Sequence, residues 1–140
     1  MYLLDTNVVS EFRKIHAGKA DKQVTSWALA TSSADMFLSV ISVHEIEVGV
    51  LRMERRDPTQ GRLFRRWHED FVLKAFFGRI LLVDVDVALV SASFHVPDPA
   101  PVRDAFIAAT ATVHGMTVVT RNTGDFIRSG VRVLNPWQWD

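Results

Sequence analysis

Five short apolar runs along the chain predict β-strands that are buried within a sheet. They cover residues 2–4, 37–41, 80–83, 116–119 and 131–134. Between these runs, apolar residues recur at steps of three and four, which is the spacing of an amphipathic helix. Such spacing is found within residues 8–12, 24–30, 43–53, 63–77, 84–94 and 101–114. Strands that alternate with helices predict an α/β fold with a mostly parallel sheet covered on both faces.

Residues that start or stop helices place the boundaries of these elements. Asp57-Pro58 ends one helical segment, and Pro101 suits the first position of another, which Gly115 ends. The segment from Ser42 to Glu45 has the S-x-x-E form of a capping box, which predicts a helix start at Ser42. Because no repeat or long linker divides the chain, we expect one domain over residues 1–140.

Four carboxylates follow the predicted strands, at the edge of the sheet where open α/β proteins bind their ligands. Asp5 directly follows the first strand, and Glu45 lies in the first turn of the helix after the second. Asp104 lies in the first turn of the helix at 101–114, and Asp125 follows the fourth strand. Since all four fall on one predicted side of the sheet, their joint placement favours an acidic site.

Each carboxylate taken alone also has a purely structural interpretation. Asp5 suits the N-cap of the first helix, and Glu45 completes the capping box. Asp104 is stabilised by the dipole of its helix, and Asp125 suits a turn. The individual residues leave both interpretations open.

The residue types in this set favour a hard divalent cation. Clustered carboxylates repel one another unless cations neutralise them. The chain has no cysteine, and its five histidines have no metal-binding spacing, so we expect the histidines to be structural. Oxygen ligands without sulfur or organised imidazole select Mg²⁺ or Mn²⁺.

The charge of the chain limits how it would contact nucleic acid. Its 16 basic residues equal its 16 acidic ones, and this balance argues against coating nucleic acid by bulk electrostatics. If four acids occupy one site, however, 12 acidic residues remain elsewhere against the 16 basic ones. The rest of the surface is then modestly basic. Six arginines within positions 52–66 form either a track for an RNA backbone or a solvated helix pair with acidic partners.

Four blocks of the sequence resemble the PIN-domain ribonucleases. They are residues 3–7 (LLDTN), 39–45 (SVISVHE), 101–111 (PVRDAFIAATA) and 120–126 (TRNTGDF). The blocks occur in order, and the size of the chain and its late Asn135-Pro136-Trp137 are most similar to the VapC toxins of bacterial VapBC toxin–antitoxin pairs. This resemblance implies a three-layer α/β/α PIN-like fold.

The resemblance also implies a Mg²⁺-dependent endoribonuclease. By matching positions, the metal-binding acids are Asp5, Glu45, Asp104 and Asp125, with Asp5 and Asp104 as direct ligands. The polar groups that orient ligands or the attacking water are Asn7, Thr120 and Asn122. The implied partners are an RNA substrate, a VapB-type antitoxin that masks the site, and a second copy of the chain in a homodimer.

Two other functions compete with this one. Asp84 and Asp86 imitate the acidic pair of a receiver-like signalling module, although Asp84 also suits a helix cap and no lysine follows Lys74. The second alternative is a PIN domain without catalysis that only binds RNA or a partner protein. No targeting signal or membrane span is visible, so we expect a cytoplasmic protein.

Overall fold

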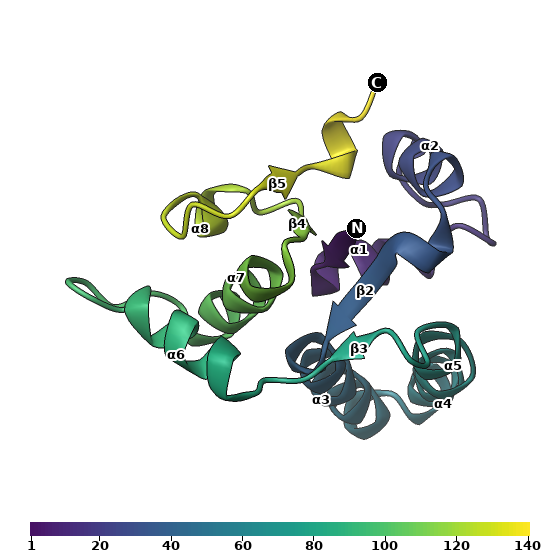
Figure 1. The fold of residues 1–140 in the computed structure, drawn as a ribbon. Helices are drawn as coiled ribbons and strands as arrows, with labels where there is room; N and C mark the ends of the chain where they lie inside the picture. Colours follow the sequence, from purple (N-terminus) through teal and green to yellow (C-terminus); the bar gives the residue numbers. More distant parts are fainter.

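A parallel sheet of five strands runs through the computed structural model, which describes all 140 residues (Figure 1). Its strands are β1 (Tyr2–Leu4), β2 (Met36–Ser39), β3 (Ile80–Leu81), β4 (Thr117–Val119) and β5 (Val133–Leu134), in the order β3-β2-β1-β4-β5. Tyr2 of β1 pairs with Met36 on one side and with Thr117 on the other. The carboxyl ends of the central strands therefore meet at one edge of the sheet.

Helices form the connections between the strands, as parallel pairing requires. They are α1 (Thr6–Phe12), α2 (Lys22–Ala30), α3 (Val40–Arg56), α4 (Pro58–Trp67), α5 (Leu73–Ala75), α6 (Val85–Ser93), α7 (Val102–His114) and α8 (Gly124–Ile127). Short turns of 3₁₀-helix span Ser33–Asp35 and Pro136–Gln138, and a π-helical turn, His68–Val72, joins α4 to α5. None of these helices combines the length and the apolar character that a membrane-spanning segment needs.

The sheet is covered on both faces, which confirms the three-layer α/β/α arrangement and the mostly parallel sheet. On one face, Leu4 of β1 packs in a cluster with Val8 of α1 and Trp27 of α2. On the other, Leu3 packs with Ile107 of α7, and Figure 1 shows α6 and α7 on that side of the strands. Successive strand residues point to opposite faces, so both must be apolar when both faces are buried.

The predicted capping box of α3 is wrong. The helix begins at Val40, and its N-cap is Ser39, whose Oγ accepts a hydrogen bond from the Ile41 N–H at 3.0 Å. The second strand therefore ends at Ser39, and Ser42 lies buried inside the helix. Glu45 is placed in the second turn of α3 and does not cap it.

The helical segment expected at 63–77 is in fact three consecutive elements. Asp57 ends α3 and also caps α4, accepting a hydrogen bond from the Gln60 N–H at 3.2 Å, so α4 already begins at Pro58. The π-helical turn then interrupts the regular helix. Apolar spacing alone does not distinguish these winding types, because it reports only which residues share a face.

Other helix boundaries agree with the sequence. Pro101 stands at the start of α7, one position outside the helix, and Gly115 ends it with a φ of 67°, in the left-handed region that favours glycine. Asp84 caps α6 by accepting a hydrogen bond from the Val87 N–H at 2.9 Å. The capping interpretation of Asp84 is thus confirmed.

Helices α3 and α4 pack so closely that one position of α4 has no room for a side chain. A Cβ at Gly61 would overlap the backbone of Glu54 on α3. Gly49 on α3 is the opposite case, since a Cβ there would meet nothing within 4 Å. The two glycines thus separate the effect of crowding from that of helix propensity.

We expect Gly61→Ala to lower the free energy of unfolding by about 1–3 kcal/mol, because the added methyl group forces α3 and α4 apart. Gly49→Ala is expected to raise it by about 0.5–1 kcal/mol, since alanine favours a helix over glycine. Urea denaturation of both variants measures the two values. Equal effects of the two substitutions would contradict the close contact at Gly61.

Candidate active site

Asp5 is the most buried carboxylate of the chain, at 7% exposure, and lies at the junction of β1 and α1. It is the N-cap of α1, and its Oδ1 accepts a hydrogen bond from the Thr6 N–H at 2.8 Å. Its Oδ2 accepts one from the Thr120 hydroxyl, directly after β4, at 2.7 Å. The capping interpretation of Asp5 is therefore confirmed for Oδ1, whereas Oδ2 is held by a residue that follows the neighbouring strand.

Asn7, Thr120 and Asn122 form the surroundings of Asp5. The Asn7 amide donates to Asp5 Oδ2 at 3.4 Å and to the Thr120 oxygen at 3.3 Å. The Asn122 backbone N–H donates to the same Thr120 oxygen at 3.0 Å. Asn122 thus contributes its backbone, and its exposed side chain makes no hydrogen bond to this cluster. These contacts join the ends of β1 and β4.

The other predicted acids converge on Asp5 from three further elements, α3, α7 and α8. Burial and, after it, the charges of Asp5, Asp125 and Glu45 together raise the pKa of Asp104 to about 6. Carboxylates shift one another in this way only when they lie close together. The structure therefore brings the four acids to one edge of the sheet, as the strand order predicts.

Burial is also the main cause of the shifts at Asp5 and Glu45. Burial and the charge of Asp125 raise the pKa of Asp5, and the increase remains although the hydrogen bonds from Thr120 and Thr6 lower it. Burial and the charge of Asp5 raise the pKa of Glu45, whereas Arg103 lowers it. The negative charge of the clustered carboxylates therefore exceeds the positive charge of the basic side chains near them.

The donor set fits a hard divalent cation. The side chains that meet here offer carboxylate, hydroxyl and amide oxygens, and the excess negative charge favours a cation. No three acidic or histidine side chains approach closely enough to enclose a metal ion by themselves. A hard cation of the Mg²⁺ type does not require such a cage, because it is usually held by one or two carboxylates together with waters and substrate phosphates.

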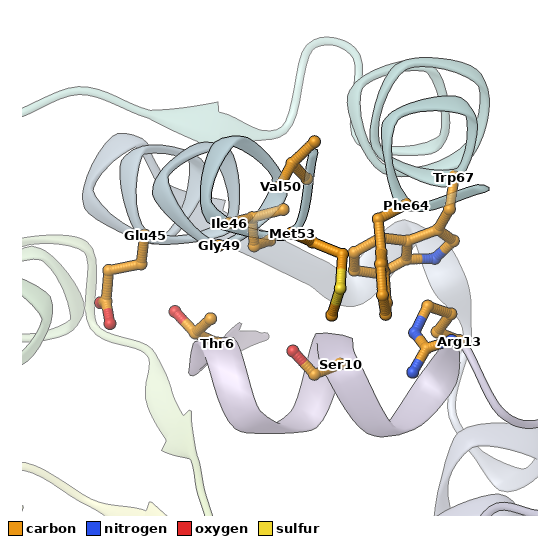
Figure 2. A pocket seen from close by; sticks show the side chains of 10 residues that line it. All are labelled: Thr6, Ser10, Arg13, Glu45, Ile46, Gly49, Val50, Met53, Phe64 and Trp67. Carbon is orange, nitrogen blue, oxygen red and sulfur yellow. The ribbon is translucent and has the colours of Figure 1, made fainter. Parts of the chain in front are cut away.

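Two residues near the site were not predicted as site residues, although both lie within the sequence blocks that contain the predicted acids. The Thr6 hydroxyl is buried and has no hydrogen-bond partner; it faces Glu45 and lowers its pKa without completing a bond (Figure 2). Arg103 is the nearby cation that acts on Glu45. The sequence could have pointed to both residues, because Thr6 directly follows Asp5 and Arg103 directly precedes Asp104.

A cavity of about 270 Å³ opens beside the carboxylates, between α1, α3 and α4 (Figure 2). Thr6 and Glu45 line its end next to the site, and Arg13 and Trp67 line the other. A larger apolar groove of about 530 Å³ adjoins it and shares Arg13 and Trp67 with it. Phe71, 56% exposed, is one of the groove's aromatic side chains.

The arginine cluster at 52–66 divides into two parts. Arg65 is bound on both sides, by Glu47 at 2.6 and 2.8 Å and by Glu54 at 2.9 Å, which ties α4 to α3. The structural interpretation holds for this residue. The remaining arginines make no ion pair, and they are Arg52, Arg55, Arg56, Arg62 and Arg66.

Comparisons with known proteins agree with this geometry. Residues 2–130 match the family described as PIN domain. The chain belongs to the PIN-domain family. It is 36% identical to the VapC ribonuclease Y4jK of Sinorhizobium fredii, over 99% of both chains.

Two solved structures share the fold of this PIN domain. FitAcB from Neisseria gonorrhoeae has a TM-score of 0.88 and 34% identity, over 99% of both chains. A toxin–antitoxin complex from Klebsiella pneumoniae has a TM-score of 0.65 and 25% identity, over 97% of this chain and 98% of that one. The receiver-like alternative gains no support, since Asp84 caps α6 and neither it nor Asp86 shifts the pKa of the site carboxylates.

The raised pKa of Asp104 predicts how the metal-free PIN domain responds to pH. An unfolded aspartate titrates near pH 3.9, so between about pH 4 and 6 the folded state binds more protons than the unfolded one. The free energy of unfolding must therefore fall as pH rises through this window. Asp104→Asn removes this contribution and should stabilise the metal-free protein at pH 7 by about 1 kcal/mol, allowing for solvent screening.

Urea denaturation at pH 4 to 7 without divalent cations measures this difference. Asp86→Asn, on the exposed first turn of α6, is the matched control and should keep the pH dependence of the wild type. An Asp104→Asn variant with an unchanged pH dependence would show that neither burial nor the like charges raise the pKa of this side chain.

Proposed function

We propose that this PIN domain is a Mg²⁺-dependent endoribonuclease that acts as the toxin of a toxin–antitoxin pair. The observation that carries the proposal is the meeting of four carboxylates with Thr120 and Asn7 at one sheet edge. The ribonuclease name of the relative from Sinorhizobium fredii supports the same activity. Mn²⁺ has the same ligand preference and is expected to substitute for Mg²⁺.

Each site residue receives a role from its place. Asp5 and Asp104 are the direct metal ligands, with Glu45 and Asp125 completing the negative set. A bound divalent cation lowers the pKa of its water and offsets charge on the phosphate under attack. Thr120 and Asn7 hold the Asp5 carboxylate in one orientation, and the Asn122 N–H fixes the Thr120 hydroxyl that does so.

We assign the apolar groove beside the site to the antitoxin. Exposed apolar patches of this kind mark protein interaction sites. The groove shares Arg13 and Trp67 with the far end of the cavity that Glu45 lines, so a chain seated in it extends toward the active site through that cavity. The Klebsiella pneumoniae complex, a toxin with its antitoxin, supports a partner of this class. A homodimer remains a prediction from the resemblance.

Removing a direct ligand should abolish cleavage of RNA. We expect the wild type to cut total RNA with Mg²⁺ but not with EDTA, and Asp5→Asn or Asp104→Asn to lower the rate at least about 100-fold. Gel electrophoresis of the products measures the rate. Asp86→Asn preserves the exposed helix of α6 and should cleave as the wild type does.

Two outcomes would contradict this mechanism in different ways. Equal cleavage by the wild type and the two ligand variants would remove the carboxylates from the reaction. RNA binding without cleavage under any divalent cation would identify a PIN domain that is catalytically silent.

A charge placed in the apolar groove should separate the antitoxin from the ribonuclease activity. Phe71→Asp is expected to weaken antitoxin binding at least about tenfold, because burying a phenylalanine contributes about 1.5–3 kcal/mol. Phe77→Asp is the control, since Phe77 is 87% exposed and lies outside the groove. Calorimetric titration with the product of the reading frame beside the toxin gene gives both affinities. Equal affinities of the two variants would place the antitoxin elsewhere.

A further inference from the structure

The floor of the 270 Å³ cavity is a polar row on α1. Thr6, Ser10 and Arg13 are four and three residues apart, so they share one face of the helix. Figure 2 shows the Thr6 and Ser10 hydroxyls directed from α1 toward α3. The row begins next to Glu45, at the carboxylate site, and runs about 10 Å along the helix to Arg13.

The opposite wall of the cavity is apolar and partly aromatic. Met53 of α3 and Phe64 and Trp67 of α4 line it around the far end (Figure 2). Gly49 lies between Glu45 and Met53 on the same face of α3, one helical turn from each. Because a Cβ at Gly49 would meet nothing within 4 Å, the missing side chain leaves the middle of the cavity open.

Arg13 is the cation at the far end of the cavity. Its guanidinium lies over the Phe64 ring, 4.3 Å from the ring centroid, and makes no ion pair with any carboxylate of the chain. The aromatic ring holds the guanidinium in place without neutralising it. An arginine held in this way presents its N–H groups to an anion, and phosphate suits their fork geometry.

We propose that this cavity is a nucleotide subsite for the RNA strand next to the bond that is cut. One base lies against the apolar wall of Met53, Phe64 and Trp67, its sugar passes over Thr6 and Ser10, and Arg13 binds the following phosphate. The assignment rests on the proposed ribonuclease function, because the scissile phosphate has to lie at the carboxylates.

Three features favour a nucleotide over another occupant. The volume of about 270 Å³ is near the lower end of ligand pockets, about 300 Å³, so it suits one residue of a polymer. Its lining matches the parts of a nucleotide, because the apolar wall suits a base and the cation suits a phosphate. It is also continuous with the reacting site through Thr6 and Glu45, whereas the larger groove begins only at Arg13 and Trp67.

Filling the cavity at Gly49 tests the subsite without disturbing the carboxylates. Gly49→Leu adds a Cβ that meets nothing within 4 Å on an exposed helix position, so we expect the fold to be retained. Two substrates are compared with Mg²⁺: an RNA oligonucleotide, and bis(p-nitrophenyl) phosphate, which has no sugar and no second phosphate and so cannot extend through the subsite to Arg13. We expect the ratio of kcat/KM for RNA to that for the small diester to fall about tenfold or more.

Binding without metal gives a second readout that does not depend on cleavage. In EDTA, a short single-stranded RNA should quench the fluorescence of Trp67 in the wild type, and Trp67→Phe identifies that signal. Gly49→Leu should weaken this binding about tenfold. Circular dichroism and the thermal midpoint confirm that the variant is folded.

Removing the positive charge of Arg13 tests its proposed contact with a phosphate. Arg13→Gln should weaken RNA binding and make the dependence of affinity on salt shallower by about one phosphate contact. Arg132→Gln is the matched control, since Arg132 is also exposed and without an ion pair but lies outside the cavity and outside the arginine cluster at 52–66. Arg13→Lys should restore part of the salt dependence, because it restores the charge without the fork.

The outcomes separate the subsite from the function on which it rests. If the wild type cleaves neither substrate, the proposed ribonuclease function fails. If it cleaves both and Gly49→Leu keeps the wild-type ratio and affinity, the subsite assignment fails and the function stands. If Gly49→Leu leaves RNA binding unchanged but weakens antitoxin binding, the cavity belongs to the antitoxin and the proposal is overturned.

Discussion

The hydrogen bond from the Thr120 hydroxyl to the Asp5 carboxylate is the contact on which the site depends. It joins two residues 115 positions apart, at the ends of neighbouring strands. Both residues are buried, and a carboxylate in that position is costly unless its oxygens are bonded. The same bond therefore satisfies a buried charge and fixes the orientation of the Asp5 carboxylate.

The strand order explains why the remaining charges collect around this bond. Neighbouring parallel strands end at one edge, so the segments after β1, β2 and β4 have to start there. Each brings an acid, and burial raises the pKa values of Asp5 and Glu45 and that of Asp104 in the first turn of α7. The fold thus holds together charges that repel one another, which is an arrangement that a divalent cation stabilises.

Helix α3 links this site to the surface that would contact a ligand. Glu45 belongs to the carboxylate set, while Gly49 and Met53 continue the same helix face along the adjoining cavity. The position of α4 against α3 is fixed by the close approach at Gly61 and by Arg65 between Glu47 and Glu54. Packing of these two helices therefore sets where the aromatic wall stands relative to the carboxylates.

The sequence by itself determined the alternation of strands and helices, the places of Asp5, Asp104 and Asp125 after them, and the caps at Asp84 and Gly115. These features depend on local spacing and on single residues with one strong preference. It misplaced the start of α3, because Ser39 and Ser42 are both good caps and only the end of β2 selects between them. The π-helical turn after α4 was equally invisible, since it preserves the apolar face.

Only the tertiary structure decided which polar groups meet. The bond between Thr120 and Asp5, the pairing of Arg65 with two glutamates and the open space at Gly49 all join distant segments. The polar row of Thr6, Ser10 and Arg13 was readable in the spacing of the chain, but its significance came from the helices that face it. A sequence pattern states which side chains share a face, and packing decides what that face encloses.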